Sequence, residues 1–237
     1  MRKFFKISGL LLLILIIGVF IFGYTIHEPE PAGVESPEAD QMVQTIYTNL
    51  NKTAWDSTQW VKWRFSRGHQ YHWDKFNNRV QVKWDDLEVV LDLNTQKGIV
   101  KKGGNVLSGS EAEAESKKAY SMFCNDSFWL IAPFKLTDPG TQRTIATLPD
   151  GRKGLKISYG NGGVTPGDSY VWLLDEKGSP TEFKMWVSIL PVGGITATWD
   201  RWVTLSTGAK VATAHLVGGK VESNVEGLEG GMGTPGF

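Results

Sequence analysis

The fold of this chain is decided by the stretch Asn125-Asp126-Ser127-Phe128-Trp129-Leu130-Ile131-Ala132-Pro133-Phe134-Lys135-Leu136. Helical spacing of apolar residues leads into this stretch, and strand-like alternation resumes after it. We therefore expect it to close the one long helix in mid-chain and to open the second half of a single sheet.

The helix before this stretch is predicted to start at a capping box, Ser110-x-x-Glu113, in which each side chain bonds the other residue's backbone N–H. We expect it to end near Asn125. Cys124 is the only cysteine, so it can form neither an intramolecular disulfide nor a cysteine-based metal site. We expect it to pack as a buried side chain rather than to act as a reactive thiol. The inner stripe of the helix is predicted to be Ala112, Ser116, Ala119, Tyr120 and Phe123.

An earlier helix is predicted from Ser36, whose hydroxyl suits an N-cap, followed by Pro37 in the first turn and Glu38 near the positive end of the helix dipole. We expect this helix to lie on the sheet of its own domain; the alternative is a partner-binding helix. Its apolar stripe recurs at intervals of three and four residues: Met42, Val43, Ile46, Tyr47 and Leu50.

From Trp60 onward the period changes to two, which is typical of strands with one apolar face. The alternation predicts antiparallel hairpins, and the two striped helices can cover the apolar face of the sheet. The expected fold class is α+β, mainly antiparallel β: a curved half-barrel sheet of about ten strands with two covering helices. The predicted runs are 60–66, 69–74, 80–84, 87–94, 99–102, 155–159, 169–175, 181–189, 195–198, 201–205 and 210–217.

The N-terminal region predicts a membrane anchor. A basic flank, residues 1–6, precedes an uncharged run over 7–26, and twenty helical residues span roughly 30 Å, the thickness of a bilayer's hydrocarbon core. A cleaved signal peptide is the alternative, but Gly23-x-Thr25 is a poor cleavage site. A lipid-modified N-terminus is excluded because no cysteine follows the run. The basic flank places the rest of the chain across the membrane from the cytoplasm.

The remaining domain map follows from composition. Residues 27–36 are rich in proline and acids, which favours an extended spacer. Residues 37–217 form one β-rich domain, and the Gly-rich tail 218–237 is expected to be flexible, without order past about Leu228. Lys plus Arg equals Asp plus Glu at 25 each, so the net charge that nucleic acid binding requires is missing.

No catalytic or metal-binding constellation emerges from the sequence. His69 and His72 are three residues apart on one strand, so they face opposite sides and cannot share an ion without a bulge. His215 is expected to be a hydrogen-bonded structural histidine rather than a base. Four aspartates each follow a tryptophan, and we expect them to cap turns rather than to act as a pair of acid and base: Asp56, Asp74, Asp85 and Asp200.

The aromatic content is high, with ten Trp, eleven Phe and six Tyr. Rings on neighbouring strands offer more surface than a thin core needs, so they fit an apolar cavity for acyl chains; a filled core is the alternative. The candidate cavity residues are Val43, Ile46, Tyr47, Leu50, Trp63, Phe65, Trp73, Trp84, Tyr120, Phe123, Trp129, Trp172 and Trp199.

Several motifs resemble an uncharacterised family of bacterial envelope proteins, which is similar in turn to the LolA/LolB lipoprotein-carrier superfamily. The resemblance covers about Glu38 to Val217. It implies an unclosed antiparallel barrel, with the two predicted helices as a lid, that holds the lipid chains of a lipoprotein or a free lipid; it implies no catalytic residue. The motifs are Trp63-x-Phe65, His72-Trp73-Asp74-Lys75, the stretch 125–136, Asp138-Pro139-Gly140 and Val164-Thr165-Pro166-Gly167-Asp168.

The leading hypothesis is therefore a non-enzymatic binding protein without cofactor or metal. It would be a single-pass protein of the bacterial inner membrane, with a periplasmic domain that holds a lipid or lipid-modified partner in the concave side of a half-barrel. The runner-up is an envelope scaffold or interaction domain with a solid core, and an envelope hydrolase that uses His215 or a carboxylate pair comes third.

Overall fold

A computed structural model describes residues 25, 27–65, 68–160 and 167–233. The predicted anchor over 7–26 lies outside the described residues except for Thr25. Within these ranges, no helix has both the length and the apolar character needed to cross a membrane.

The described chain forms one sheet of fifteen antiparallel strands that does not close on itself. From edge to edge the order is β1-β8-β9-β10-β11-β12-β14-β15-β2-β3-β4-β5-β6-β7, and β13 pairs with β14 beside this path. The strands of the first half are β1 (Gly33–Val34), β2 (Trp60–Phe65), β3 (Gln70–Asp74), β4 (Arg79–Trp84), β5 (Leu87–Asp92), β6 (Lys97–Lys102) and β7 (Asn105–Val106). Those of the second half are β8 (Thr141–Thr147), β9 (Lys153–Tyr159), β10 (Ser169–Leu174), β11 (Pro180–Trp186), β12 (Ile195–Thr198), β13 (Asp200–Thr204), β14 (Lys210–Val217) and β15 (Val221–Gly231).

The predicted class, mainly antiparallel β with few helices, is confirmed. The strand number is higher than expected because β1, β7, β8 and β15 were not predicted. β1 and β7 have two residues each, too few to show a period. In β8 three consecutive residues, Thr144 to Ala146, are buried, so its sequence does not alternate.

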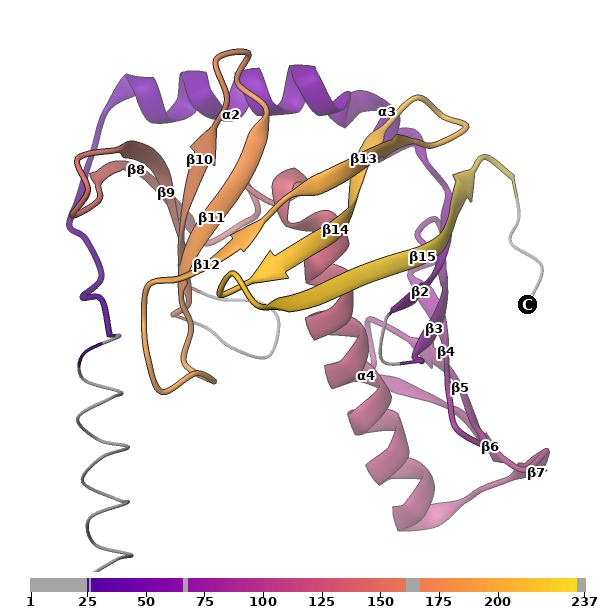
Figure 1. The fold of residues 1–237 in the computed structure, drawn as a ribbon. Coiled ribbons are helices and arrows are strands. Elements are labelled where there is room, and N and C mark those ends of the chain that lie inside the picture. The colour runs from indigo at the N-terminus through magenta and orange to yellow at the C-terminus, as the bar shows by residue number, and fades with distance from the viewer. Residues whose placement is uncertain (1–24, 26, 66–67, 161–166, 234–237) are drawn as a thin grey trace, which may run out of the picture.

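The largest correction concerns the tail. Residues 218–237 were expected to be flexible, yet β15 occupies Val221–Gly231 and joins the two halves of the sheet (Figure 1). It pairs with β14 through Ala214↔Asn224 to Val217↔Val221, and with β2 through Val225↔Phe65 to Gly231↔Trp60. The glycines of this strand allow close packing rather than disorder, since a Cβ on Gly230 would come within 3.0 Å of the Leu205 side chain.

The segment 27–36 is extended, as predicted, but it is docked on the sheet rather than free. Its residues 33–34 form β1 and pair with β8. The backbone of Glu28 bonds Gly193, and its carboxylate lies 2.5 Å from the Lys184 Nζ. The second half of the sheet therefore holds this segment in place.

Helix α2 (Pro37–Leu50) forms as predicted: the Ser36 hydroxyl accepts the Glu38 N–H, and Val43, Ile46 and Leu50 are buried. A short helix that was not predicted, α3 (Lys52–Ser57), follows directly. Asn51 lies between them in the left-handed region (φ 55°), and its side chain accepts the Ala54 N–H. One residue therefore ends α2 and caps α3.

Helix α4 (Gly109–Ile131) differs from the prediction at both ends. Its N-cap is Ser108, without a side-chain cap bond, so the expected capping box at Ser110 and Glu113 is wrong. The helix also continues past Asn125 and ends at Ile131, followed by the short 3₁₀ helix η1 (Ala132–Phe134). Pro133 prevents further α-helix, because proline has no N–H to donate and its ring clashes with the preceding turn. The stretch 125–136 is thus mostly the last turns of α4.

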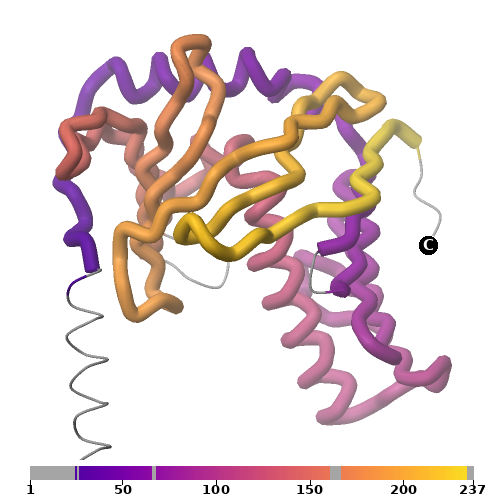
Figure 2. Tube along the Cα trace, in the orientation of Figure 1, coloured from indigo at the N-terminus to yellow at the C-terminus, as the bar shows by residue number. Residues whose placement is uncertain are grey.

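The main hydrophobic core lies between the helices and the sheet, and residues of both halves of the sheet contribute to it. A second, smaller cluster in the second half comprises Ala146, Leu148, Val171, Leu173 and Trp186. Figure 2 shows α4 in the middle of the molecule, between the strands β9 to β12 and the strands β2 to β7. Its ring contacts reach both groups, through Phe123 to Trp63 and through Trp129 to Phe183.

Candidate functional site

The predicted cavity residues all belong to the core. Nine of them are buried: Val43, Ile46, Leu50, Trp63, Phe65, Trp84, Phe123, Trp172 and Trp199. The other four are partly buried and pack against the core: Tyr47, Trp73, Tyr120 and Trp129. The structure therefore brings the predicted set together on the inner side of the sheet.

Within the first half of the sheet these rings contact one another directly. Trp63 stacks on Tyr71 with ring centroids 4.7 Å apart. Phe123 of α4 meets Trp73 edge to face at 5.3 Å and Trp63 at 6.3 Å. Trp55 of α3 stacks on Phe134 of η1 at 4.7 Å. These separations are those of rings in contact, which leaves no acyl-sized space between the paired faces.

A second ring cluster lies in the other half of the sheet. Trp172 is 5.0 Å from Phe183 and 5.1 Å from Trp199. His215 lies 4.7 Å from Trp199 and 5.3 Å from Trp129. The rings of this half are also packed on one another. Ring contacts thus involve six of the side chains predicted to line a hollow: Trp63, Trp73, Phe123, Trp129, Trp172 and Trp199. Ligand binding by them stays a prediction.

Several polar atoms in these clusters have no hydrogen-bond partner among the described residues. In the second cluster they are Trp172 Nε1, Trp199 Nε1 and His215 Nε2. In the first half of the sheet the indole N–H groups of Trp63, Trp73 and Trp84 are in the same state. A buried donor without an acceptor costs about 1–3 kcal/mol, so the indole N–H groups could bind an acceptor that reached them. Nε2 of the neutral His215 ring is itself an acceptor, because Nδ1 carries the proton that it donates to the Thr198 carbonyl oxygen.

Sequence reasoning missed a buried polar cluster made by Asp126, His69 and Tyr71. The Tyr71 hydroxyl donates to Asp126 Oδ2 at 2.6 Å, and His69 Nδ1 lies 2.7 Å from the same oxygen. Burial, and then the Asp126 charge, raise the pKa of Tyr71, so its hydroxyl stays protonated and donates. The cluster fastens α4 to β3. The sequence spacing could have indicated this cluster. Asp126 lies three residues after Phe123 and four before Leu130, so it shares the inner helical face with them.

The two histidines of β3 and its preceding turn face opposite sides, as predicted. His69 bonds Asp126 on the inner side, whereas His72 lies edge to face on the Trp60 ring, 5.8 Å away, and lines a groove on the outer side. Within the described residues, no group of three or more His, Cys, Asp or Glu side chains is placed to hold a metal ion.

His215 is structural in its contacts. It is 2% exposed, and its Nδ1 bonds the Thr198 carbonyl oxygen at 2.8 Å. Burial lowers the pKa of His215, so the ring is neutral at pH 7. The thiol of Cys124 is half-buried, and burial raises its pKa, which keeps it protonated and unreactive.

Three of the four aspartates that follow tryptophans have local side-chain partners. Asp74 accepts the Asn77 N–H at 2.9 Å and so caps its turn. Asp56 pairs with Lys52 one helical turn away, and Asp200 accepts the Thr198 hydroxyl at 2.5 Å. Asp85 has a positive φ of 47° in the turn between β4 and β5. The carboxylates of Asp56, Asp74 and Asp200 therefore have local structural roles.

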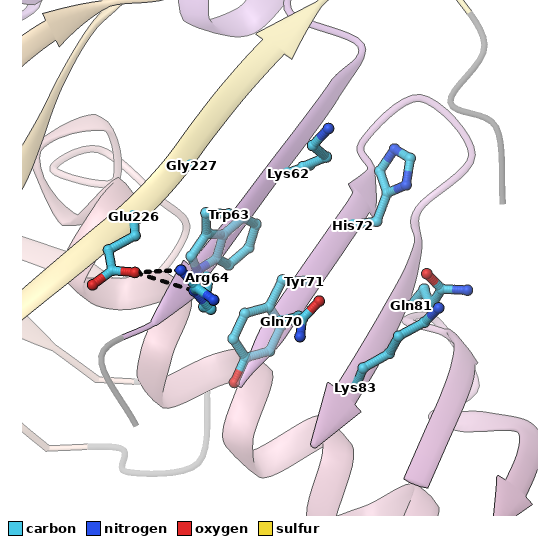
Figure 3. Close-up of a pocket in the computed structure, with 10 residues that line it drawn as sticks. All are labelled: Lys62, Trp63, Arg64, Gln70, Tyr71, His72, Gln81, Lys83, Glu226 and Gly227. Carbon is cyan, nitrogen blue, oxygen red and sulfur yellow. Dashed lines mark hydrogen bonds and ion pairs between the residues drawn. The ribbon is translucent and has the colours of Figure 1, made fainter. Parts of the chain in front are cut away.

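A polar groove of about 300 Å³ lies on the outer face of β2, β3 and β4, beside β15 (Figure 3). In Figure 3 Arg64 points to Glu226, and its guanidinium donates to Glu226 Oε2 at 2.7 and 3.1 Å. Lys62 pairs with Glu229 at 3.0 Å. These ion pairs are solvent-exposed and therefore exchange readily for other partners. The polar side chains along the groove are Lys62, Arg64, Gln70, His72, Gln81, Lys83 and Glu226.

A second groove of about 540 Å³ opens on the other side of β15, next to the β13–β14 hairpin. β15 separates from β14 after Asn224, because their pairing ends at Ala214↔Asn224. The Ser206 hydroxyl bonds the Gly230 carbonyl oxygen at 2.6 Å and ties the hairpin back to the end of β15. Both grooves touch Gly227, where φ is +57° and the register with β2 shifts. We name the two grooves together the β15 grooves.

No protein-family model matches the sequence, and no curated protein matches it either.

Proposed function

We propose that this chain is a membrane-tethered, non-enzymatic interaction domain with a solid core, which binds a polypeptide partner at the β15 grooves. The observation that carries the proposal is the contrast between the two sides of the sheet. On the inner side the aromatic side chains contact ring to ring, as Trp63 does with Tyr71 at 4.7 Å, whereas one groove lies on the outer side and a second opens beside the same bulged strand.

The lining of the grooves supports a polypeptide as the partner. One groove combines cations, a carboxylate and amides, which complement backbone carbonyls, N–H groups and charged side chains. The other groove adds apolar surface from Trp60, Val203, Leu205 and Leu228. A patch with an apolar part and a polar margin is the usual anatomy of a protein interface.

The location in this proposal is the bacterial inner membrane, with a single span over 7–26 and the domain in the periplasm. The basic flank and the apolar run support it. The proposal also includes a half-barrel shape with α2 and α4 as its two covering helices. Its support is the resemblance of the sequence motifs to a family similar to the LolA/LolB superfamily.

Site-specific cross-linking tests the proposed interface. A photo-reactive amino acid at Gln81, inside the first groove, should cross-link the full chain to a discrete protein in envelope membranes, and the product should survive delipidation. The same probe at Glu176, in the exposed turn between β10 and β11, is the matched control.

A charge reversal completes this test. Arg64→Glu should reduce the cross-link at position 81 severalfold, since it reverses a charge in the groove, while Lys177→Glu in the distant turn should not. Equal cross-linking at positions 81 and 176, or no effect of Arg64→Glu, would contradict the proposed site.

A lipid or lipid-modified partner on the inner side is the second candidate. The observation in its favour is that Trp172 Nε1, Trp199 Nε1 and His215 Nε2, three buried atoms of one ring cluster, have no hydrogen-bond partner among the described residues. A carbonyl of an ester or amide could accept from the indoles if α4 moved aside. Mass spectrometry of organic extracts from the purified full chain decides it: stoichiometric acyl species support this candidate, and their absence together with no binding of a fluorescent fatty acid counts against it.

A further inference from the structure

Residues 27 and 28 contact one loop of the sheet, the connection from β11 to β12 over 187–194. His27 Nδ1 accepts the Gly193 N–H at 3.0 Å, and the Glu28 N–H donates to the Gly193 carbonyl oxygen at 3.1 Å. Figure 1 shows this loop beside the start of the coloured chain. The loop is therefore fixed to the residues that directly follow the apolar run over 7–26.

Residues 28–31 make further contacts with β11 and β9, so the segment after the apolar run is attached to the sheet rather than a loose spacer. The Trp186 indole N–H donates to the Glu28 carbonyl oxygen at 2.7 Å, and Lys184 Nζ lies 2.5 Å from the Glu28 carboxylate. Further along, Lys156 Nζ reaches the Pro31 carbonyl oxygen at 2.8 Å and Glu30 at 2.6 Å. We call residues 27–34 the strap.

The strap sets the distance between the loop and the end of the apolar run. Gly193 bonds His27 and Glu28, the first two residues after that run. Ile189 is four residues from Gly193, so the two are at most about 14 Å apart even if the chain between them is fully extended. A run that spans a bilayer ends at the boundary between hydrocarbon and headgroups, a zone several ångströms deep on each side. A loop fastened to that end lies at the same boundary.

The exposed side chain of this loop suits that boundary. Ile189 is 66% exposed, although Val187 and Leu190 on either side of it pack inward. Pro191 is also exposed. The described loop from 187 to 194 has no charged side chain that would resist entry into the headgroup region.

We propose that the loop 187–194 is a membrane-contact surface, with Ile189 inserted among the lipid headgroups of the bilayer to which the chain is tethered. The strap holds it there, and the edge strand β7 lies at the opposite end of the sheet from β1, which belongs to the strap. This inference rests on the anchor in the proposed function; it does not depend on the partner at the β15 grooves.

Spin-label accessibility in the full chain tests the proposal. In a Cys124→Ser background, Ile189→Cys and Val106→Cys each carry one nitroxide, and the chain is reconstituted into phosphatidylcholine–phosphatidylglycerol vesicles. Val106 on β7 is a matched control because it is 67% exposed, against 66% for Ile189. The ratio of collisions with oxygen, which dissolves in lipid, to collisions with a water-soluble nickel chelate should be severalfold higher at position 189 than at 106.

The outcomes separate the anchor from the loop. If an alkaline carbonate wash removes the chain from the vesicles, the anchor fails and the inference falls with it. If the chain stays in the vesicles and the ratio at position 189 equals that at 106, the loop contact alone is overturned. A flexible Gly-Ser insert between residues 26 and 27 leaves the described fold unchanged, and it should lower the ratio at 189 to the control value; an unchanged ratio contradicts the role of the strap.

Discussion

Asp126 accepts two hydrogen bonds in the interior of the protein, and this makes it the most consequential single polar residue on α4. Tyr71 and His69 both bond its Oδ2, and the Asp126 residue is 9% exposed. A carboxylate on the inner face of a helix is stable only with such partners. The cluster thus explains how an acid fits within an otherwise apolar helical face.

Replacement of this acid should be costly. Asp126→Ala leaves the buried Tyr71 hydroxyl and the His69 ring without their acceptor, which should lower the free energy of unfolding by about 2–3 kcal/mol. Asp56→Ala removes an exposed carboxylate in an i,i+4 pair and should cost under about 0.5 kcal/mol. Urea unfolding of both variants measures the difference, and equal midpoints would show that the cluster does not fasten α4.

Lys75 gives the protein a predicted pH dependence. Burial lowers the pKa of Lys75 to about 8, and its ammonium lies 4.0 Å from the centre of the Trp55 ring. An unfolded lysine has a pKa of about 10.4. Between about pH 8 and 10.4 the unfolded state therefore binds more protons than the folded state, and the free energy of unfolding rises with pH.

The change to test is Lys75→Met, which removes the titration. From pH 8 to 9.5, the unfolding free energy of the native protein should rise relative to that of the variant, by at most about 1.4 kcal/mol per pH unit. Below pH 7 the difference between the two proteins should be constant. Parallel curves across the whole range would show that the Lys75 pKa is not lowered.

At the scale of elements, β15 shows how a strand can escape recognition. Gly227, Gly230 and Gly231 dilute its apolar pattern, and only Val225 and Leu228 remain as large apolar residues in its second half. Yet these glycines let the strand bulge at Gly227 and pass close to Leu205 and Trp60 at its end. Composition alone indicated flexibility because the partners that require glycine lie far away in the sequence.

Truncation distinguishes a flexible tail, as predicted from the sequence, from a tail that contains the structural strand β15. Removal of residues 220–237 deletes β15 and exposes the edges of β14 and β2, so cooperative unfolding should be lost. Removal of residues 234–237 leaves β15 intact and should leave stability unchanged within about 0.5 kcal/mol. Circular dichroism during thermal unfolding reads out both, and a cooperative transition in the longer truncation would contradict a structural role for β15.

At the scale of the whole molecule, one sheet whose two halves share a main core predicts a single cooperative unit. The two halves share β15 and both contact α4, so neither half buries its apolar face alone. Damage in one half should therefore destabilise the other by the same amount.

Phe123→Ala tests this coupling. Phe123 is 6% exposed and contacts Trp63, Tyr71 and Trp73, all in the first half of the sheet. Its truncation should cost about 3–5 kcal/mol. Native-state hydrogen exchange should show equal losses at Val82 in β4 and at Val171 in β10.

The control for this variant is Phe76→Ala, because Phe76 is 75% exposed and its loss should change little. Loss of protection at Val82 without loss at Val171 would mean that the two halves unfold separately.

The sequence by itself determined the local features of this protein. The N-cap at Ser36, the buried face of α2 and the runs of alternating residues in β2 to β5 each arise from neighbouring residues, so a local period reveals them. It also placed His69 and His72 on opposite faces, since that follows from strand geometry alone.

Only the tertiary structure decided the remaining features, because they depend on residues far apart in the chain. Asp126 of α4 meets Tyr71 and His69, more than fifty residues earlier in the chain, and β15 pairs with β14 and with the distant β2. The packing of Trp172 against Trp199 likewise became visible only once β10 and β12 were both paired with β11, which lies between them. Burial patterns say which side chains face inward, but whether they meet one another or surround a space is set by the distance between elements, which no local period records.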